Sequence, residues 1–82
     1  MIISESVIIY AVRYALGRMS YAVGDVCDYV KCKKNELSEE CKKIIVKEIR
    51  ENIAMCHRMG IHCGMLCDER DWLELVDVLL EE

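Results

Sequence analysis

The sequence predicts an all-α protein folded as one domain. Apolar residues recur every three or four positions along most of the chain, which is the period of a helix with one buried face. The chain has no Pro and only four Gly among its 82 residues, so few positions interrupt a helix. No Pro-, Gly- or Ser-rich stretch resembles a linker, and residues 1–82 therefore form a single domain.

The first predicted helix is long and covers residues from about 6 to 31. Ser4 or Ser6 can cap its start, because a Ser hydroxyl accepts a hydrogen bond from an amide of the first turn. The β-branched residues at its front lower helix propensity, so a short strand there is the rival prediction. Its core-facing stripe is Ile8, Val12, Ala15, Met19, Ala22, Val26 and Val30.

The second predicted helix begins after Ser38 and ends near Arg58. The segment before it breaks the helical period, and Asn35 suits a turn. Ser38 is a good N-cap, and the two acids that follow it are favoured by the helix dipole. Gly60 is placed to end the helix in a left-handed conformation. The apolar face is Cys41, Ile45, Val46, Ile49, Ile53 and Cys56.

The third predicted helix is short and begins at Asp68, which we expect to be its N-cap. Asp71 lies three residues further on and can serve as the acid of a capping box. The apolar stripe of this helix is Trp72, Leu75, Val76, Leu79 and Leu80.

Two features of the chain predict a homo-oligomer, at least a dimer. Hydrophobic residues make up 54% of the chain, whereas a domain of this size buries only about 60% of its unfolded surface. A helix of about 26 residues spans roughly 39 Å, and a compact chain of this length is roughly 30 Å across. The overhanging part of the first helix would then pack on a second subunit.

The charge pattern excludes some classes of function. A net charge of -4 argues against general nucleic-acid binding and against binding to anionic membranes. Charged residues interrupt every apolar run before it could span a membrane. Six Cys in a helical pattern without a basic leader fit reduced thiols in the cytoplasm better than a secreted disulfide scaffold. A local basic patch persists at Lys31, Lys33, Lys34, Lys42, Lys43, Lys47 and Arg50.

The first helix carries an unusual second face opposite its aliphatic stripe. At 100° per residue, Arg13 and Arg18 flank a narrow strip on opposite sides. Each of the two Gly on this strip costs about 1 kcal/mol relative to Ala inside a helix, which suggests that another molecule approaches closely. The strip consists of Tyr10, Tyr14, Gly17, Tyr21, Gly24 and Asp28.

Two interpretations of this strip are compatible. It can be a seam between the helices of two subunits, in which Gly permits close approach and Tyr supplies contact area. It can also frame a ligand pocket, in which Tyr stacks on a base and Arg holds a phosphate. Lys33 and Lys34, near the end of the same predicted helix, are reserve candidates for binding the phosphate.

The stretch "CHRMGIHCGMLC" is the only one that resembles a metal site. Tetrahedral zinc usually takes two close pairs of thiolate or imidazole ligands, and only one pair of thiols here has a suitable spacing. Buried or incidental Cys are therefore the main interpretation, and zinc is the alternative. The candidate ligands are Cys56, His57, His62, Cys63 and Cys67.

No motif of the sequence indicates an enzyme. The chain contains no Gly-rich phosphate loop, no nucleophile elbow and no His-Glu-x-x-His pattern. We expect neither catalytic activity nor a bound cofactor.

The runs "YAVRYALGRMSYAVGDVCDYV" and "CGMLCDERDWLELVDVLLEE" resemble short proteins carried by bacteriophages and prophages, over about two-thirds of the chain. In those proteins an Arg-Tyr-Ala-Leu-Gly-Arg pattern opens the first helix, and a Gly-Met-x-Cys-Asp segment precedes a Trp-Leu helix. The resemblance implies an accessory role in the host cytoplasm, by stoichiometric binding. Among small helical phage proteins in general, some block host effector complexes and others sequester nucleotide messengers of host immunity.

The leading hypothesis is a phage-type accessory protein that binds and sequesters a small phosphate-bearing nucleotide at an oligomer interface. The first alternative is an interaction module that blocks a host effector complex, and the second is a small zinc protein. The ligand-binding residues expected from the leading hypothesis are Tyr10, Arg13, Tyr14, Gly17, Arg18, Tyr21, Lys33 and Lys34.

Overall fold

The computed structural model describes residues 4–16, 23–60 and 66–81, and for residues 66–68 it describes the backbone only. Within these ranges the chain forms α-helices and one 3-10 turn, and no strand, which confirms the all-α class. The predicted rival, a strand at the front of the first helix, is wrong because this segment is helical. The elements are α1 (Glu5–Leu16), α2 (Val23–Cys32), η1 (Lys34–Glu36), α3 (Glu39–Arg58) and α4 (Leu66–Leu80).

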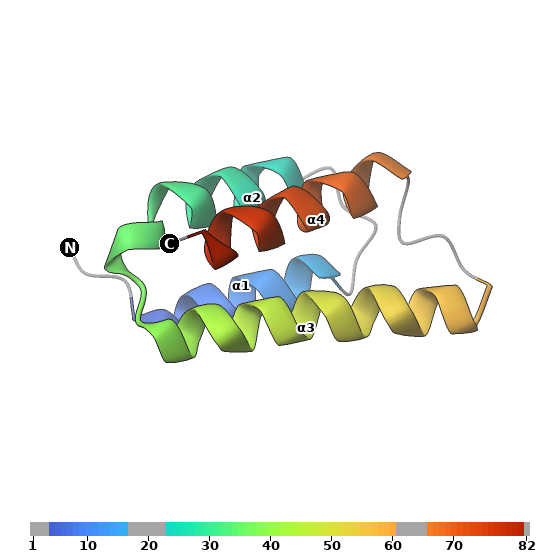
Figure 1. Ribbon diagram of the computed structural model, residues 1–82, viewed down its shortest axis with the longest axis horizontal. Helices are drawn as coiled ribbons and strands as arrows, with labels where there is room; N and C mark the ends of the chain where they lie inside the picture. Colours follow the sequence, from blue (N-terminus) through green and yellow to red (C-terminus); the bar gives the residue numbers. More distant parts are fainter. Residues whose placement is uncertain (1–3, 17–22, 61–65, 82) are drawn as a thin grey trace.

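The helices pack as a four-membered bundle (Figure 1). The main contacts join α1 to α2 and α3, and join α4 to α2 and α3. The two diagonals of the bundle are therefore α1 with α4 and α2 with α3. In the view of Figure 1, α3 lies in front of α1 and α4 lies in front of α2, so the α3/α4 face lies opposite the α1/α2 face.

The prediction of one continuous helix over residues 6–31 is wrong. α1 ends at Leu16, α2 begins at Val23, and the two helices pack against each other. Segments of one straight helix separated in this way could not touch, because each residue adds 1.5 Å along the axis. The chain therefore reverses direction between them, and the argument that an overhanging helix needs a second subunit no longer applies.

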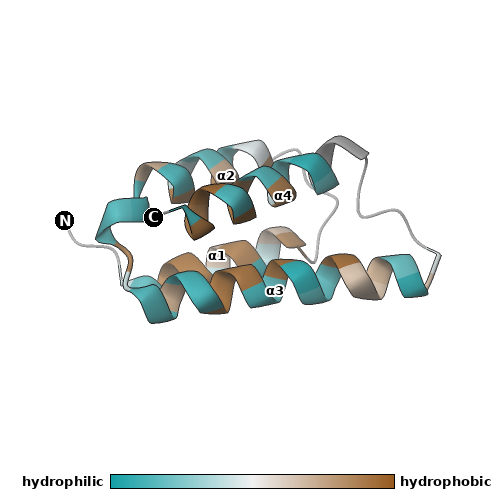
Figure 2. Cartoon of the chain, viewed as in Figure 1, coloured by the Kyte–Doolittle hydropathy of each residue, from teal (hydrophilic) through white to brown (hydrophobic). Residues whose placement is uncertain are grey.

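The apolar stripes of the three predicted helices, which form four helices in the structure, meet in one core, and Met19 and Ala22 of the first stripe lie outside the described residues. The largest fully buried side chains include Ile45, Ile49 and Leu75, and the single Trp, Trp72, is also buried. Among the described residues, no polar or charged side chain is buried. Figure 2 shows α3 with alternating polar and apolar stretches, whereas α1 is hydrophobic over most of its length. One predicted core residue, Leu80, is 53% exposed.

The predicted helix ends are right at Ser38 and Gly60 and wrong at Asp68. The Ser38 hydroxyl accepts a hydrogen bond from the Cys41 amide, as an N-cap should. Gly60 follows α3 with a φ of 68°, the left-handed region that favours Gly. α4 begins at Leu66, so Asp68 is a residue of its first turn and not its N-cap.

Hydrogen bonds fix the end of the bundle at which α1 and α3 begin. Ser4 caps α1, because its hydroxyl oxygen accepts a hydrogen bond from the Ser6 amide. Glu5 then ties the start of α1 to the start of α3 through two hydrogen bonds that Ser38 donates to its carboxylate.

Of the helices described, none combines the length and the apolar character needed to cross a membrane.

Candidate functional site

The outward side of α1 carries three large, solvent-exposed side chains on successive turns. Val7 is 54% exposed, Tyr10 is 68% exposed and Tyr14 is 51% exposed. Residues three and four apart on a helix are neighbours, so these side chains form one continuous surface, which we call the tyrosine face. The rings of Tyr10 and Tyr14 are stacked, with centroids 6.3 Å apart and planes inclined by 26°.

The tyrosine face exists because α1 is apolar on two sides. Ile8, Val12 and Ala15 fill the core side, and the opposite side would normally carry charged residues in a soluble helix. Tyr offers a broad apolar ring and a hydroxyl at a small cost in conformational entropy, which is why it is common at binding surfaces.

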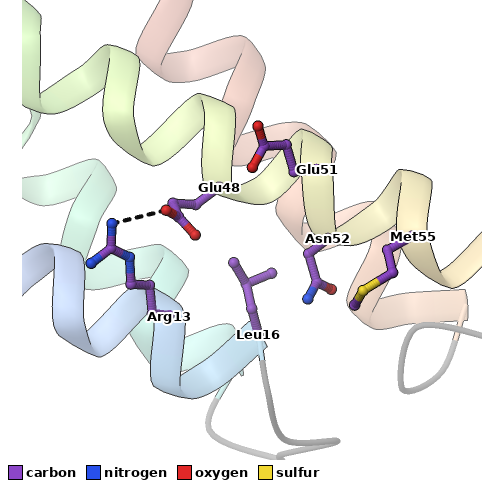
Figure 3. Close-up of a pocket in the computed structure, with 6 residues that line it drawn as sticks. All are labelled: Arg13, Leu16, Glu48, Glu51, Asn52 and Met55. Atoms are coloured by element: carbon purple, nitrogen blue, oxygen red, sulfur yellow. Dashed lines mark hydrogen bonds and ion pairs between the residues drawn. The ribbon is translucent and has the colours of Figure 1, made fainter.

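Arg13 lies beside the tyrosine face and is held by α3. Its guanidinium donates a hydrogen bond to the Glu48 carboxylate over 2.9 Å, in an ion pair whose Arg side chain is 56% exposed. Figure 3 shows this pair at the edge of a hollow of about 220 Å³ between α1 and α3. The other lining residues are Leu16, Glu51, Asn52 and Met55.

This hollow is a poor site for a phosphate. Glu48 compensates the charge of Arg13, and Glu51 adds a second negative charge to the lining. An anion entering here would displace one carboxylate and meet another, and like charges at close range repel each other. The part of the predicted site that surrounds Arg13 therefore suits apolar contact better than phosphate binding.

The structure separates Lys33 and Lys34 from Arg13. These two lysines follow α2, at the end of the bundle where α1 begins, whereas Arg13 lies in the last turn of α1 (Figure 1). Lys33 forms an ion pair with Glu36 at 3.4 Å and lies 5.9 Å from the ring centroid of Tyr29. Lys34 reaches the Glu81 carboxylate at 3.4 Å.

The remaining predicted site residues, Gly17, Arg18 and Tyr21, lie outside the described residues. The reversal of the chain moves Gly24 and Asp28 from the strip on the first helix to a different helix, α2. A Cβ at Gly24 would meet no described residue within 4 Å, so no close contact with the described part of the chain requires Gly there. Of the six-residue strip, Tyr10 and Tyr14 are the described members that share a face.

The candidate zinc ligands are described only in part. His57 pairs with Glu69 on α4 at 2.9 Å, and Cys56 lies 3.8 Å from the Asn52 side-chain oxygen. In the portions of the chain that the structure describes, no group of three or more metal-ligating side chains comes together. His62, Cys63 and the side chain of Cys67 fall outside those portions.

Sequence reasoning assigned no function to one surface that the structure assembles, a basic groove between α3 and α4. Lys43, Lys47 and Arg50 line it at a spacing of four and three residues, together with the exposed Leu80. That spacing places the three cations on one side of a helix. This pattern in the sequence could have indicated the basic surface. The neighbour of these cations across the groove, α4, could be known only from the fold.

No family model, no curated protein and no solved structure matches the chain.

Proposed function

We propose that the protein is a non-catalytic binding module that contacts a partner protein through the tyrosine face of α1. The observation that carries this proposal is the exposure of Val7, Tyr10 and Tyr14 on successive turns of one helix. Such a surface costs free energy in water, about 25 cal/mol for each Å² of apolar area left exposed. A partner that covers it recovers that free energy.

The composition of the tyrosine face fits a protein contact. Tyr is enriched among the residues that contribute most to binding energy at protein interfaces, together with Trp and Arg. The stacking of Tyr10 on Tyr14 holds both rings in place before binding, which lowers the entropy lost on association. Arg13 lies at the edge of the face with its charge compensated by Glu48, as suits the polar rim of an interface.

The partner expected from this chemistry presents a flat or helical apolar surface. Helix α1 runs for 12 residues, which corresponds to about 18 Å of axis. Three anchors spaced along that length match a helix packed on a groove or on another helix. The resemblance to phage proteins makes a host effector complex the type of partner that we propose.

Nucleotide capture at an oligomer interface is the second candidate. It is favoured by the exposed, stacked rings of Tyr10 and Tyr14, because aromatic faces accept bases by stacking. It is opposed by Glu48 and Glu51 around Arg13, so this proposal relies on Arg18 for the phosphate. The two candidates use the same face and differ in the partner.

Paired binding experiments test both candidates. Immobilised wild-type protein, the double variant Tyr10→Ala/Tyr14→Ala and the control Tyr29→Ala are each incubated with host lysate, and bound proteins are quantified by mass spectrometry. We expect one partner on the wild type and on the Tyr29→Ala control, reduced at least tenfold on the double variant. Equal recovery on all three proteins contradicts the protein-binding proposal.

Calorimetry of the purified chain with a panel of cyclic nucleotides tests the second candidate. It predicts binding that Arg18→Ala abolishes without changing the mass of the protein in solution. Absence of heat across the whole panel rejects nucleotide capture and leaves the protein-binding proposal untouched.

A further inference from the structure

The groove between α3 and α4 is the second surface of this chain that suits a partner. Two hollows lie along it, of about 340 Å³ and 390 Å³, and they share Lys43 and Leu80 as lining residues. Together they extend along α3 from Glu39 to Glu51, which corresponds to about 18 Å of helix axis.

One wall of this groove carries positive charge that the chain leaves uncompensated. Lys43 and Arg50 have no ion-pair or hydrogen-bond partner among the described residues, and Lys47 reaches Glu51 only at 3.9 Å. Like charges one turn apart on a helix repel each other and destabilise it. On α3 itself, Glu51 lines the same hollow and pairs with Lys47, so Lys43 and Arg50 are the cations of this row that lack a partner among the described residues.

Helix α4 carries exposed groups on the side that bears Leu80. Leu73 is 45% exposed and Leu80 is 53% exposed, seven residues and thus two turns apart on α4. Asp77 lies between them, is exposed and has no partner in the described part of the chain. The α3/α4 face therefore combines the cations of α3 with exposed Leu side chains and the carboxylate of Asp77 on α4.

A face of this kind is complementary to itself, and we propose that a second copy of the chain docks on it. A two-fold axis parallel to the helices places α3 of one protomer against α4 of its partner. The two rows of Leu73 and Leu80 then meet at the centre, as apolar residues do in the core of an interface.

The register within one protomer sets the opposing charges. The hollow that Leu80 lines extends along α3 from Lys43 to Glu51, and α3 and α4 run in opposite directions (Figure 1). Lys47 lies within this stretch, and Asp77 lies about one turn before Leu80, so the two residues stand within about one turn of each other along the bundle. A two-fold axis along the helices preserves this level, and Lys47 of one protomer faces the carboxylate of Asp77 in the other.

The size of the face fits a dimer. The molecule measures 39 × 23 × 18 Å, so the outline of its broadest side is roughly 900 Å², and a typical specific interface buries about 800 Å² of accessible surface per partner. The tyrosine face lies on α1, diagonal to α4, and stays accessible in this dimer.

Reversing the charge of Lys47 or of Asp77 tests the proposed dimer, and sedimentation velocity measures the mass in solution. The wild type should sediment with a mass near twice 9.5 kDa. Lys47→Glu and Asp77→Lys should each weaken the dimer at least tenfold, because each variant brings two like charges together twice per dimer. The control Asp28→Lys, on the outer side of α2, should leave the mass unchanged.

Mixing the two variants distinguishes loss of the dimer contact from a general effect on folding. An equimolar mixture of Lys47→Glu and Asp77→Lys should restore a heterodimer, since both contacts then join opposite charges. A wild type that stays monomeric at all concentrations overturns the proposal, and so does a mixture that fails to associate. A dimer lost on Tyr10→Ala/Tyr14→Ala but kept in both charge variants places the contact on α1 instead.

Discussion

At the scale of single residues, Glu5 organises the junction between α1 and α3. The Ser38 amide donates to one carboxylate oxygen at 2.6 Å, and the Ser38 hydroxyl donates to the other at 3.1 Å. The backbone hydrogen bond from Ser38, followed by that from its hydroxyl, holds the pKa of Glu5 below its usual value of 4.5. Burial, and then the charge of Glu5, raise the pKa of the neighbouring Cys41 thiol.

This junction predicts a specific loss of stability in acid. Because the pKa of Glu5 is lower in the folded state, its contribution is complete above pH 4.5 and disappears as pH falls through the folded-state pKa. Glu5→Gln should be less stable than wild type at neutral pH, and the difference should vanish in acid. Urea denaturation at neutral pH and at a series of pH values below 4.5 measures it, and Asp28→Asn is the control. A difference that does not change with pH contradicts this role.

At the scale of elements, α3 is the helix that the sequence specifies best and the one on which the bundle depends. Ser38 caps it, Gly60 ends it, and Ile45 and Ile49 are fully buried on its core face. α3 also contacts both α1 and α4. It thus positions Glu48 beside the tyrosine face and Lys47 beside the α4 wall.

Removing one side chain from this core face should be costly. Ile45→Ala deletes a side chain with 0% exposure, and such deletions destabilise proteins by about 2–5 kcal/mol, through lost burial and the cavity left behind. Val7→Ala on exposed α1 should change the free energy of unfolding by less than about 0.5 kcal/mol. Guanidinium denaturation of both variants checks the contrast, and similar losses for the two would show that Ile45 is not a core residue.

At the scale of the whole molecule, the bundle separates its two proposed binding faces. α1 is diagonal to α4, so a dimer formed on the α3/α4 groove leaves one tyrosine face free on each protomer. Two identical faces on one particle would bind a multisubunit partner with an avidity above that of one face.

A single core also predicts a single unfolding transition. Trp72 is 3% exposed and lies in the cluster that all four helices share. Its fluorescence should therefore change together with the far-UV circular dichroism of the helices during thermal unfolding. Two separate midpoints would show that α4 leaves the bundle before the other helices unfold.

The reversal between α1 and α2 shows why a helical period does not define a helix. Val12 and Val26 fit one continuous period, yet they lie on two helices that pack against each other. Both helices bury their apolar stripes in the same core, so the spacing of apolar residues along the sequence does not show where the chain reverses. Gly17, directly after the last residue of α1, was an available signal, because Gly commonly follows the end of a helix.

The sequence by itself determined the properties that depend on neighbours along the chain. These are the all-α class, the buried faces of the helices, the cap at Ser38 and the left-handed end at Gly60. They follow from side-chain period and local backbone hydrogen bonding, which involve residues a few positions apart. The tertiary structure alone decided that Glu48 compensates Arg13 and that Lys47 lies across a groove from α4. Those contacts join residues far apart in sequence, and their partners are set by how the helices pack.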